Sequence, residues 1–203
     1  MRENQGHENG QAVSPVVGVM LMLVVTIIIA AVVSAFSGGL AGTQQKAPQA
    51  SIDVRFIQDD GGMGSSYMNW KMTFAHMSGD TIQTKDLNII TYYTVSNGSV
   101  VKHTQTPISD ATDLYGNSKL TRVPFLNDQS LGRSGNNPSM DFGNYTWKTG
   151  DILSSGSDEG TSAILGFNIT SDEHDFRSGS VVDVKILHVP SGKYIYDNEV
   201  IAP

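Results

Sequence analysis

The sequence contains no cysteine among its 203 residues and no charged residue between Glu8 and Lys46. The absence of cysteine excludes disulfides, thiolate metal ligands and a cysteine nucleophile. Basic residues are also few, because 13 Lys and Arg stand against 20 Asp and Glu, for a net charge of −7. An acidic chain without a basic cluster is repelled by a phosphate backbone, so we expect no nucleic-acid partner.

Sequence motifs of known catalytic chemistry are missing as well. The chain has no G-x-S-x-G, Walker loop, H-E-x-x-H or G-x-G-x-x-G motif. Its five histidines are scattered, and no two of them have the spacing of metal ligands. The carboxylates of the contiguous cluster Asp172-Glu173-His174-Asp175 do not alternate as those of a calcium loop do, and residues 59–62 are typical of a turn. We therefore expect no enzyme activity, no cofactor and no bound metal.

An apolar run near the N-terminus dominates the rest of the pattern. Between residues 16–36, only Gly18, Thr26 and Ser34 interrupt the apolar side chains. A helix of about 20 residues crosses the roughly 30 Å hydrocarbon core of a bilayer. In lipid, a single segment satisfies all its backbone groups only as a helix. The sequence predicts a hydrophobic helix over residues 13–37.

Three interpretations of this apolar segment remain open on its length alone. A secretory signal peptide has an apolar core of about 7–15 residues, which is shorter than this run. Small residues at Ala35-x-Ser37 and Ser37-x-Gly39 nevertheless resemble cleavage sites of such a signal. The other two interpretations are a permanent membrane anchor and a helix that is later packed into a filament. Residues in front of the run bear on that choice.

Residues 1–12 form a short polar leader that ends in small residues against the apolar run. The segment AVSPVVGVMLM that begins at Ala12, with the following VVTIIIAAVVSAFSGGL, resembles the N-terminal signature of archaeal type IV pilins. The resemblance implies a class III signal peptide that a prepilin peptidase removes. The implied cut lies between Ala12 and Val13, with the bond between Gly10 and Gln11 as the alternative. The leader departs from the family pattern because it has no basic residue beside either bond.

The resemblance also implies a function and a location. It implies a structural subunit of an archaeal surface filament, used for adhesion, that is held in the cell membrane before assembly with its N-terminus in the cytoplasm. Partners would be other copies of the chain, other pilins, the prepilin peptidase, the assembly machinery and membrane lipid. The competing hypothesis is a membrane-anchored surface binding protein that does not polymerise.

Small residues recur at four-residue spacing toward the end of the predicted helix. Such rows allow two helices to approach closely. One row contains Ala30, Ser34, Gly38 and Gly42, and the next contains Ala31, Ala35 and Gly39. Residues 38–49 are rich in Gly and Gln and are expected to form a flexible linker.

The remaining residues, 50–203, show the pattern of a β-rich head. Alternating or β-branched stretches, separated by turn residues, predict strands. They cover residues 51–57, 67–77, 87–95, 99–103, 120–126, 162–169, 180–189 and 194–201. Asn97-Gly98 is a strong signal for a hairpin between two of them. Because no helical period is found after residue 50, the sequence predicts an all-β, sandwich-like (immunoglobulin-like) head that follows one long helix.

Three N-x-S/T triplets could accept an N-linked glycan, at Asn97, Asn144 and Asn168. This modification needs an asparagine that is exposed on the surface. Asn97 lies at the predicted hairpin tip, and Asn144 lies at the end of a loop. Asn168 lies late in a predicted strand, where it is expected to be less accessible.

Overall fold

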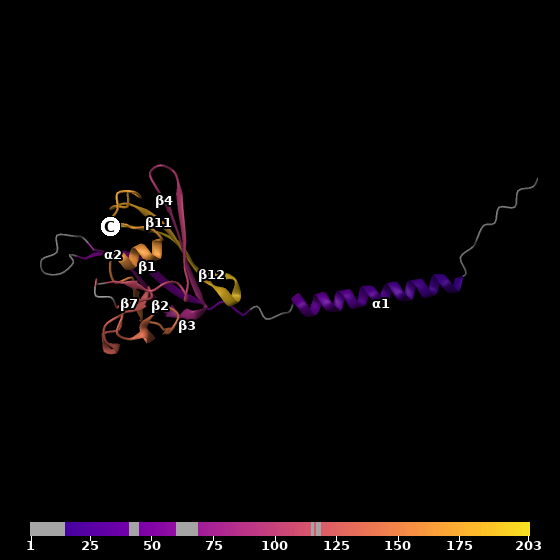
Figure 1. Cartoon of the computed structure of the whole chain (residues 1–203). Coiled ribbons are helices and arrows are strands. Elements are labelled where there is room, and N and C mark those ends of the chain that lie inside the picture. Colours follow the sequence, from indigo (N-terminus) through magenta and orange to yellow (C-terminus); the bar gives the residue numbers. More distant parts are fainter. Residues whose placement is uncertain (1–14, 41–44, 60–68, 115, 117–118) are drawn as a thin grey trace, which may run out of the picture. The chain divides into compact units, whose positions relative to one another are not determined.

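The computed structural model describes residues 15–40, 45–59, 69–114, 116 and 119–203. The chain divides into two compact units, Met1–Gln44 and Gln45–Pro203, which are described separately (Figure 1). The first unit contains a helix and the second is the head. Residues 10–13, on which the two expected cleavage sites fall, lie outside the described residues, and so does Gly42.

The helix α1, Pro15–Leu40, extends three residues beyond the expected end at residue 37. It contains no acidic residue in its first turn and no basic residue in its last. Pro15 begins the helix, where its missing N–H costs no hydrogen bond. The Thr26 hydroxyl donates to the Leu23 carbonyl at 2.9 Å, so this polar group needs no partner outside the helix.

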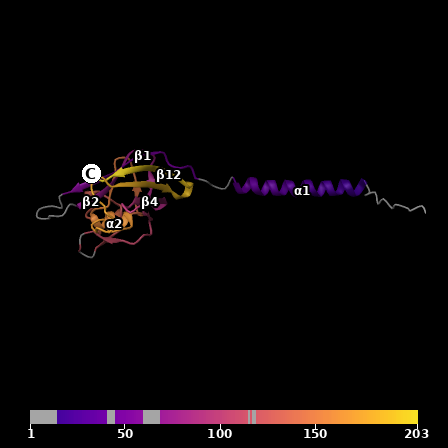
Figure 2. The same ribbon diagram turned by 90° about the horizontal axis from the view of Figure 1, so that it is seen from above.

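The head contains two four-stranded antiparallel sheets (Figures 1 and 2). The first has the order β1-β2-β10-β8, with bounds Ala50–Asp59, Asn69–Gly79, Ile152–Ser154 and Phe125–Leu126. The second has the order β12-β11-β4-β5, with bounds Lys193–Ile201, Val181–His188, Leu87–Thr94 and Val100–Gln105. One helix followed by an antiparallel β-rich head is the predicted fold class, which is confirmed.

A single apolar core lies between these sheets, and strand alternation explains its composition. In β11, Val182, Val184 and Ile186 point inward and are buried, while the residues between them face outward. In β2, the alternate residues Met72 and Phe74 also face inward and are fully buried. The alternation predicted from the sequence is therefore correct for the long strands.

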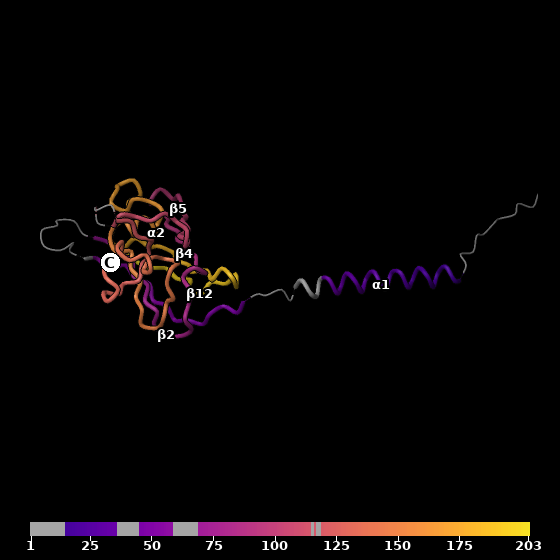
Figure 3. Tube along the Cα trace, turned by 60° about the horizontal axis from the view of Figure 1, so that its bottom comes forward, coloured from indigo at the N-terminus to yellow at the C-terminus, as the bar shows by residue number. Residues whose placement is uncertain are grey.

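The two sheets are joined by different elements on the two sides of the head. On one side, the edge strands β1 and β12 lie beside each other (Figure 2). On the other side, a short helix, α2, Asp158–Leu165, lies against β2, β4 and β5 (Figure 3). Thr161 of α2 donates to the Trp70 carbonyl at 2.6 Å, and Thr91 of β4 donates to the Ile164 carbonyl at 3.1 Å. The helix is thereby tied to both sheets.

The expected strand over residues 162–169 is wrong, because its first half belongs to α2. The statement that no helix follows residue 50 is wrong for the same reason. The Ser157 hydroxyl caps the helix by accepting the Gly160 N–H at 3.4 Å. Gly166, with φ of 80°, ends the helix in the left-handed conformation. These start and stop signals were present in the sequence but were outweighed by the apolar run between them.

Short elements complete the head, and most were not predicted. The single strand expected over residues 120–126 is two strands, β7, Leu120–Thr121, and β8. Two small sheets pair β6, Thr112–Asp113, with β7, and β3, Ile82–Gln83, with β9, Thr146–Trp147. The 3-10 turns are η1, Thr84–Asp86, η2, Gln129–Leu131, η3, Pro138–Met140, and η4, Val189–Ser191.

Gln49, the last residue of the expected linker, is fastened to the head. Its N–H donates to the Asp80 carboxylate at 2.9 Å, and its carbonyl accepts the Asp80 N–H at 2.8 Å. Gly79 has φ of 113°, and a Cβ at that position would lie 2.2 Å from the Gln49 carbonyl oxygen. Only glycine fits this turn, which holds the start of β1 in place.

A buried carboxyl in the head gives a test by pH. Burial raises the pKa of Asp141 above its ordinary value of 3.8, although the backbone N–H and the charge of Arg122 oppose this shift. A group with a raised folded pKa stabilises the fold fully below its unfolded pKa, and this contribution is lost as the pH rises through the folded pKa. We therefore expect Asp141→Asn to raise the free energy of unfolding at pH 7 and to flatten its decline between about pH 4 and pH 7.

The measurement is urea unfolding of the full chain in mild detergent at several pH values, followed by fluorescence of the two tryptophans, Trp70 and Trp147. Asp110→Asn, which changes an exposed carboxyl, is the control and should shift stability by less than about 0.5 kcal/mol. A pH profile that stays unchanged in Asp141→Asn would contradict the assignment.

Candidate functional site

The first candidate site is the surface of α1. Every side chain from Pro15 to Ala35 is exposed, and the large apolar ones are 44–72% exposed. Among the described residues, α1 alone is long and apolar enough to span a membrane, over Pro15–Ala35. Burying one such side chain stabilises by roughly 1.5–3 kcal/mol, so the whole face amounts to tens of kcal/mol. This helix is suited to lipid or to contact with other apolar helices, and poorly suited to water.

The small residues predicted to pack helices lie on this surface where they are described. Ala30, Ala31, Ser34 and Ala35 are in α1 and exposed, and Gly38 is within the same helix. Because residues four apart lie one above the other on a helix, Ala30, Ser34 and Gly38 follow one row. The chemistry this surface offers is close apolar contact.

The second candidate site lies at the end of the head away from the entering chain, called the distal end here. The entry end is marked by Lys46, Asp86 and His188, which line one depression. Strand β4 begins there and runs roughly 23 Å to Thr94, as its eight residues require. The distal end therefore consists of the β4–β5 hairpin tip, residues 95–99, and the segment 166–180.

Aromatic contacts hold the segment 166–180 against the sheets. The Phe167 ring stacks on Tyr93, with centroids 5.1 Å apart, and on His174 at 4.6 Å. Phe176 packs edge-on against Tyr93 and also against Trp70, at 5.7 Å in each case. Sequence reasoning missed this cluster, because its members come from strands and a loop that are far apart in the chain.

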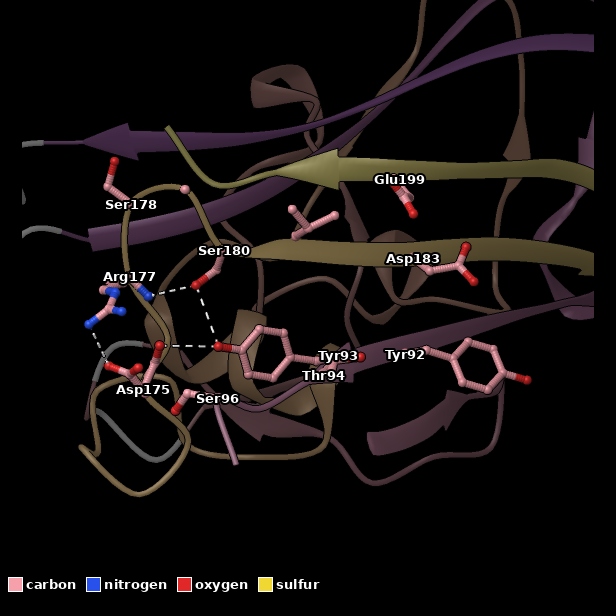
Figure 4. Close-up of a pocket in the computed structure, with 12 residues that line it drawn as sticks. Tyr92, Tyr93, Thr94, Ser96, Asp175, Arg177, Ser178, Ser180, Asp183 and Glu199 are labelled. Carbon is pink, nitrogen blue, oxygen red and sulfur yellow. Dashed lines mark hydrogen bonds and ion pairs between the residues drawn. The ribbon is translucent and has the colours of Figure 1, made fainter. Parts of the chain in front are cut away.

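A shallow depression of about 750 Å³ lies at the distal end (Figure 4). The Tyr93 hydroxyl donates toward the carbonyls of His174 and Asp175, both at 3.1 Å, and lies 3.5 Å from Ser180 Oγ. Arg177 pairs with the Asp175 carboxylate at 3.0 Å. These contacts hold the wall of the depression in place.

The outer face of the second sheet borders this depression, and several of its charged groups have partners within the head. Asp183 lies 3.2 Å from Lys185, and Lys102 lies over the Tyr92 ring, 5.4 Å from its centroid. Charges that pair within the head are poor candidates for general acid–base work. Within the described part of the chain, no three His, Asp or Glu side chains converge where they could hold a metal ion.

All three candidate glycan acceptors lie on the surface of the head, in different settings. Asn97 is at the hairpin tip, as predicted. Asn168 is not in a strand, which corrects the expectation, and it is exposed in the turn that follows α2. Asn144 lies just before β9, whose partner β3 follows the entry-end residue Asp80. The structure thus brings Asn97 and Asn168 to the distal end and keeps Asn144 apart from them.

A largely apolar N-terminal helix in the same chain as an antiparallel β head is the architecture expected of a subunit that is anchored or assembled through its helix. Residues 11–52 match the family model described as archaeal type IV pilin, N-terminal. This family is one of structural proteins. The match spans α1 and the first residues of β1, about a fifth of the chain, and it confirms the predicted resemblance. No curated protein and no solved structure matches the chain.

Proposed function

We propose that this chain is a pilin, a structural subunit of an archaeal type IV pilus-like surface filament. The observation that carries the proposal is the exposed apolar surface of α1 within the segment that matches the pilin family. Such a surface requires lipid or further copies of the same helix. A filament supplies those copies, and contacts that do not close on themselves extend into an open helical polymer.

In this proposal, α1 has two successive roles, first as a membrane anchor and then as part of the filament core. Before assembly, α1 crosses the cell membrane with the leader, residues 1–12, in the cytoplasm. Cutting between Ala12 and Val13, or alternatively between Gly10 and Gln11, removes the charges that hold the N-terminus there. The helix then leaves the lipid and packs against neighbouring helices along the small residues of its later turns, so that apolar contacts replace lipid contacts. The head stays outside, where it serves adhesion.

Partners follow from the same scheme. They are other copies of the chain and other pilins in the filament, the prepilin peptidase and assembly machinery, and lipid before assembly. The second candidate function is a membrane-anchored binding protein that does not polymerise, and the distal depression is the observation that favours it. Because an anchored protein would stay with the cells under shear while a pilin would be released, the two are separable by experiment.

The test is mass spectrometry of the mature N-terminus on membrane and sheared fractions separately. A chain that begins at Val13 or Gln11 and is enriched in the sheared fraction supports the pilin. An intact Met1 confined to membranes would leave only the anchored alternative. A start near residues 36–40 would mean that the helix is a discarded secretory signal.

Replacement of Ala12 by phenylalanine is expected to block processing and filament formation together. A prepilin peptidase that cuts after a small residue cannot accept the larger side chain, and the retained leader keeps charges next to the helix. We expect the full-length mass in the membrane fraction and at least a tenfold loss of sheared protein. Ala12→Gly keeps a small residue and should be processed. Filaments built from Ala12→Phe would contradict the assigned cut.

A further inference from the structure

The side-chain carbonyls of Asn97 and Asn168 are held in the same way by the third residue of each triplet. Asn97 Oδ1 accepts the Ser99 N–H at 2.8 Å and the Ser99 hydroxyl at 2.5 Å. Asn168 Oδ1 accepts the Thr170 N–H at 3.0 Å and the Thr170 hydroxyl at 2.7 Å. Within the described residues, neither amide nitrogen donates to an acceptor. Each exposed Asn therefore presents a free Nδ2 group to solvent.

Asn144 is exposed too, but its amide nitrogen is already engaged. Its Nδ2 donates to the Pro138 carbonyl at 2.8 Å, and its backbone N–H donates to the Asp141 carbonyl at 2.9 Å. Thr146, the third residue of this triplet, is in β9 and pairs with Gln83. The triplet is thus fastened at both ends to neighbouring backbone.

We propose that Asn97 and Asn168 are the glycan acceptors of this protein and that Asn144 is not modified in the folded head. In the transfer, Nδ2 forms a bond to the anomeric carbon of a glycan carried on a lipid phosphate. The bond from that carbon to the phosphate oxygen breaks, the lipid phosphate leaves with the electron pair, and one Nδ2 proton passes to a base of the transferase. An Nδ2 group that donates to a carbonyl must first give up that hydrogen bond and rotate outward.

The two proposed acceptors lie where glycans would not cover the entry end of the head. Both lie at the distal end, away from the entry end where the chain comes from α1. Glycans there would leave the entry end of the head free, whereas Asn144 lies before β9, which is linked through β3 to the entry end. This inference rests on the proposed surface location of the head but does not depend on polymerisation.

The test is glycopeptide mass spectrometry of the protein from its native host, with Asn97→Gln, Asn168→Gln and Asn144→Gln compared. We expect occupancy at Asn97 and Asn168 at least tenfold above that at Asn144, and loss of glycan mass only in the first two variants. Asn137→Gln is the matched control. Asn137 Oδ1 also accepts the N–H and hydroxyl of Ser139, but its triplet has Pro138 in the middle and its Nδ2 donates to the Leu131 carbonyl at 3.0 Å.

Comparable occupancy at all three sites, or glycan at Asn144 alone, would overturn the proposal. Absence of glycan from all three sites would also overturn the proposal. Shearing of the same cells then tests whether the proposed pilin function still stands. If the unmodified protein is in the sheared filament fraction, the proposed function stands without the glycans. If the protein never reaches the surface, the proposed function falls as well.

Discussion

Replacement of Ile28 by aspartate is expected to abolish filaments while the protein stays in the membrane. Ile28 lies near the middle of α1, and its side chain is 55% exposed. An aspartate at the centre of a membrane helix costs about 2.5–3.5 kcal/mol, while the other Val, Leu and Ile residues of the segment contribute roughly −3 to −7 kcal/mol in total. Over most of these ranges the sum still favours insertion, and the modest cost of the carboxyl reflects the relief that snorkelling and local water give it in lipid.

A filament core offers no such relief for the same carboxyl. Each copy would bury an unpaired charge against neighbouring helices, at a cost of several kcal/mol per subunit, and the polymer repeats that cost along its length. The measurement is the amount of protein in membrane and sheared fractions. Ile28→Val, which remains apolar, should retain both. Normal filaments from Ile28→Asp would show that this part of α1 is not buried in a filament core, whereas loss of the protein from the membrane would contradict the estimated balance for insertion.

Replacement of Gly160 by alanine is expected to destabilise the head by about 3 kcal/mol or more, the opposite of what helix propensity predicts. Alanine in a helix interior is normally favoured over glycine by about 1 kcal/mol. In α2, however, a Cβ on Gly160 would lie 1.8 Å from the Ser155 carbonyl oxygen and 2.9 Å from a methyl group of Leu114. Backbone atoms cannot move aside as a flexible side chain can, so α2 must shift.

Such a shift would disturb a buried network. Ser155 Oγ accepts the Met72 N–H at 2.9 Å and lies 2.7 Å from the Thr161 hydroxyl, which in turn donates to the Trp70 carbonyl. The measurement is urea unfolding followed by tryptophan fluorescence. Glu159→Ala, at the adjacent exposed position, should cost less than about 0.5 kcal/mol. A Gly160→Ala head that is as stable as the original would mean that the close approach of α2 to Ser155 is wrong.

Local propensity also failed to predict that α2 is a helix. Helix α2 has only eight residues, and its apolar side chains read as a short buried strand. What makes it a helix is its cap, together with hydrogen bonds to strands about 70 to 90 residues away in the chain. Long strands such as β2 and β11 were predicted because half of each faces the core, and this leaves a period of two in the sequence.

For the glycan acceptors, the sequence identified three candidates and predicted Asn168 to be the least accessible, whereas the hydrogen bonds set Asn144 apart instead. Nothing in the triplet at Asn144 indicates that its amide will meet the Pro138 carbonyl, since that contact depends on the turn between them. The strand assigned around Asn168 was wrong for the same kind of reason. Accessibility of an asparagine side chain depends on the neighbours that the folded chain brings to it.

The sequence by itself determined the apolar helix, its resemblance to archaeal type IV pilins and the β-rich character of the head. These properties are local, because hydrophobic length, strand alternation and the N-terminal signature are each carried by a continuous stretch of residues. Tertiary structure alone decided the helix α2, the joining of Gln49 to the turn at Gly79, and the difference between Asn144 and the other two acceptors. Each of these depends on contacts between residues distant in the chain, or on one particular turn. The one-dimensional pattern carries only local cap signals for α2 and no signal for the other two.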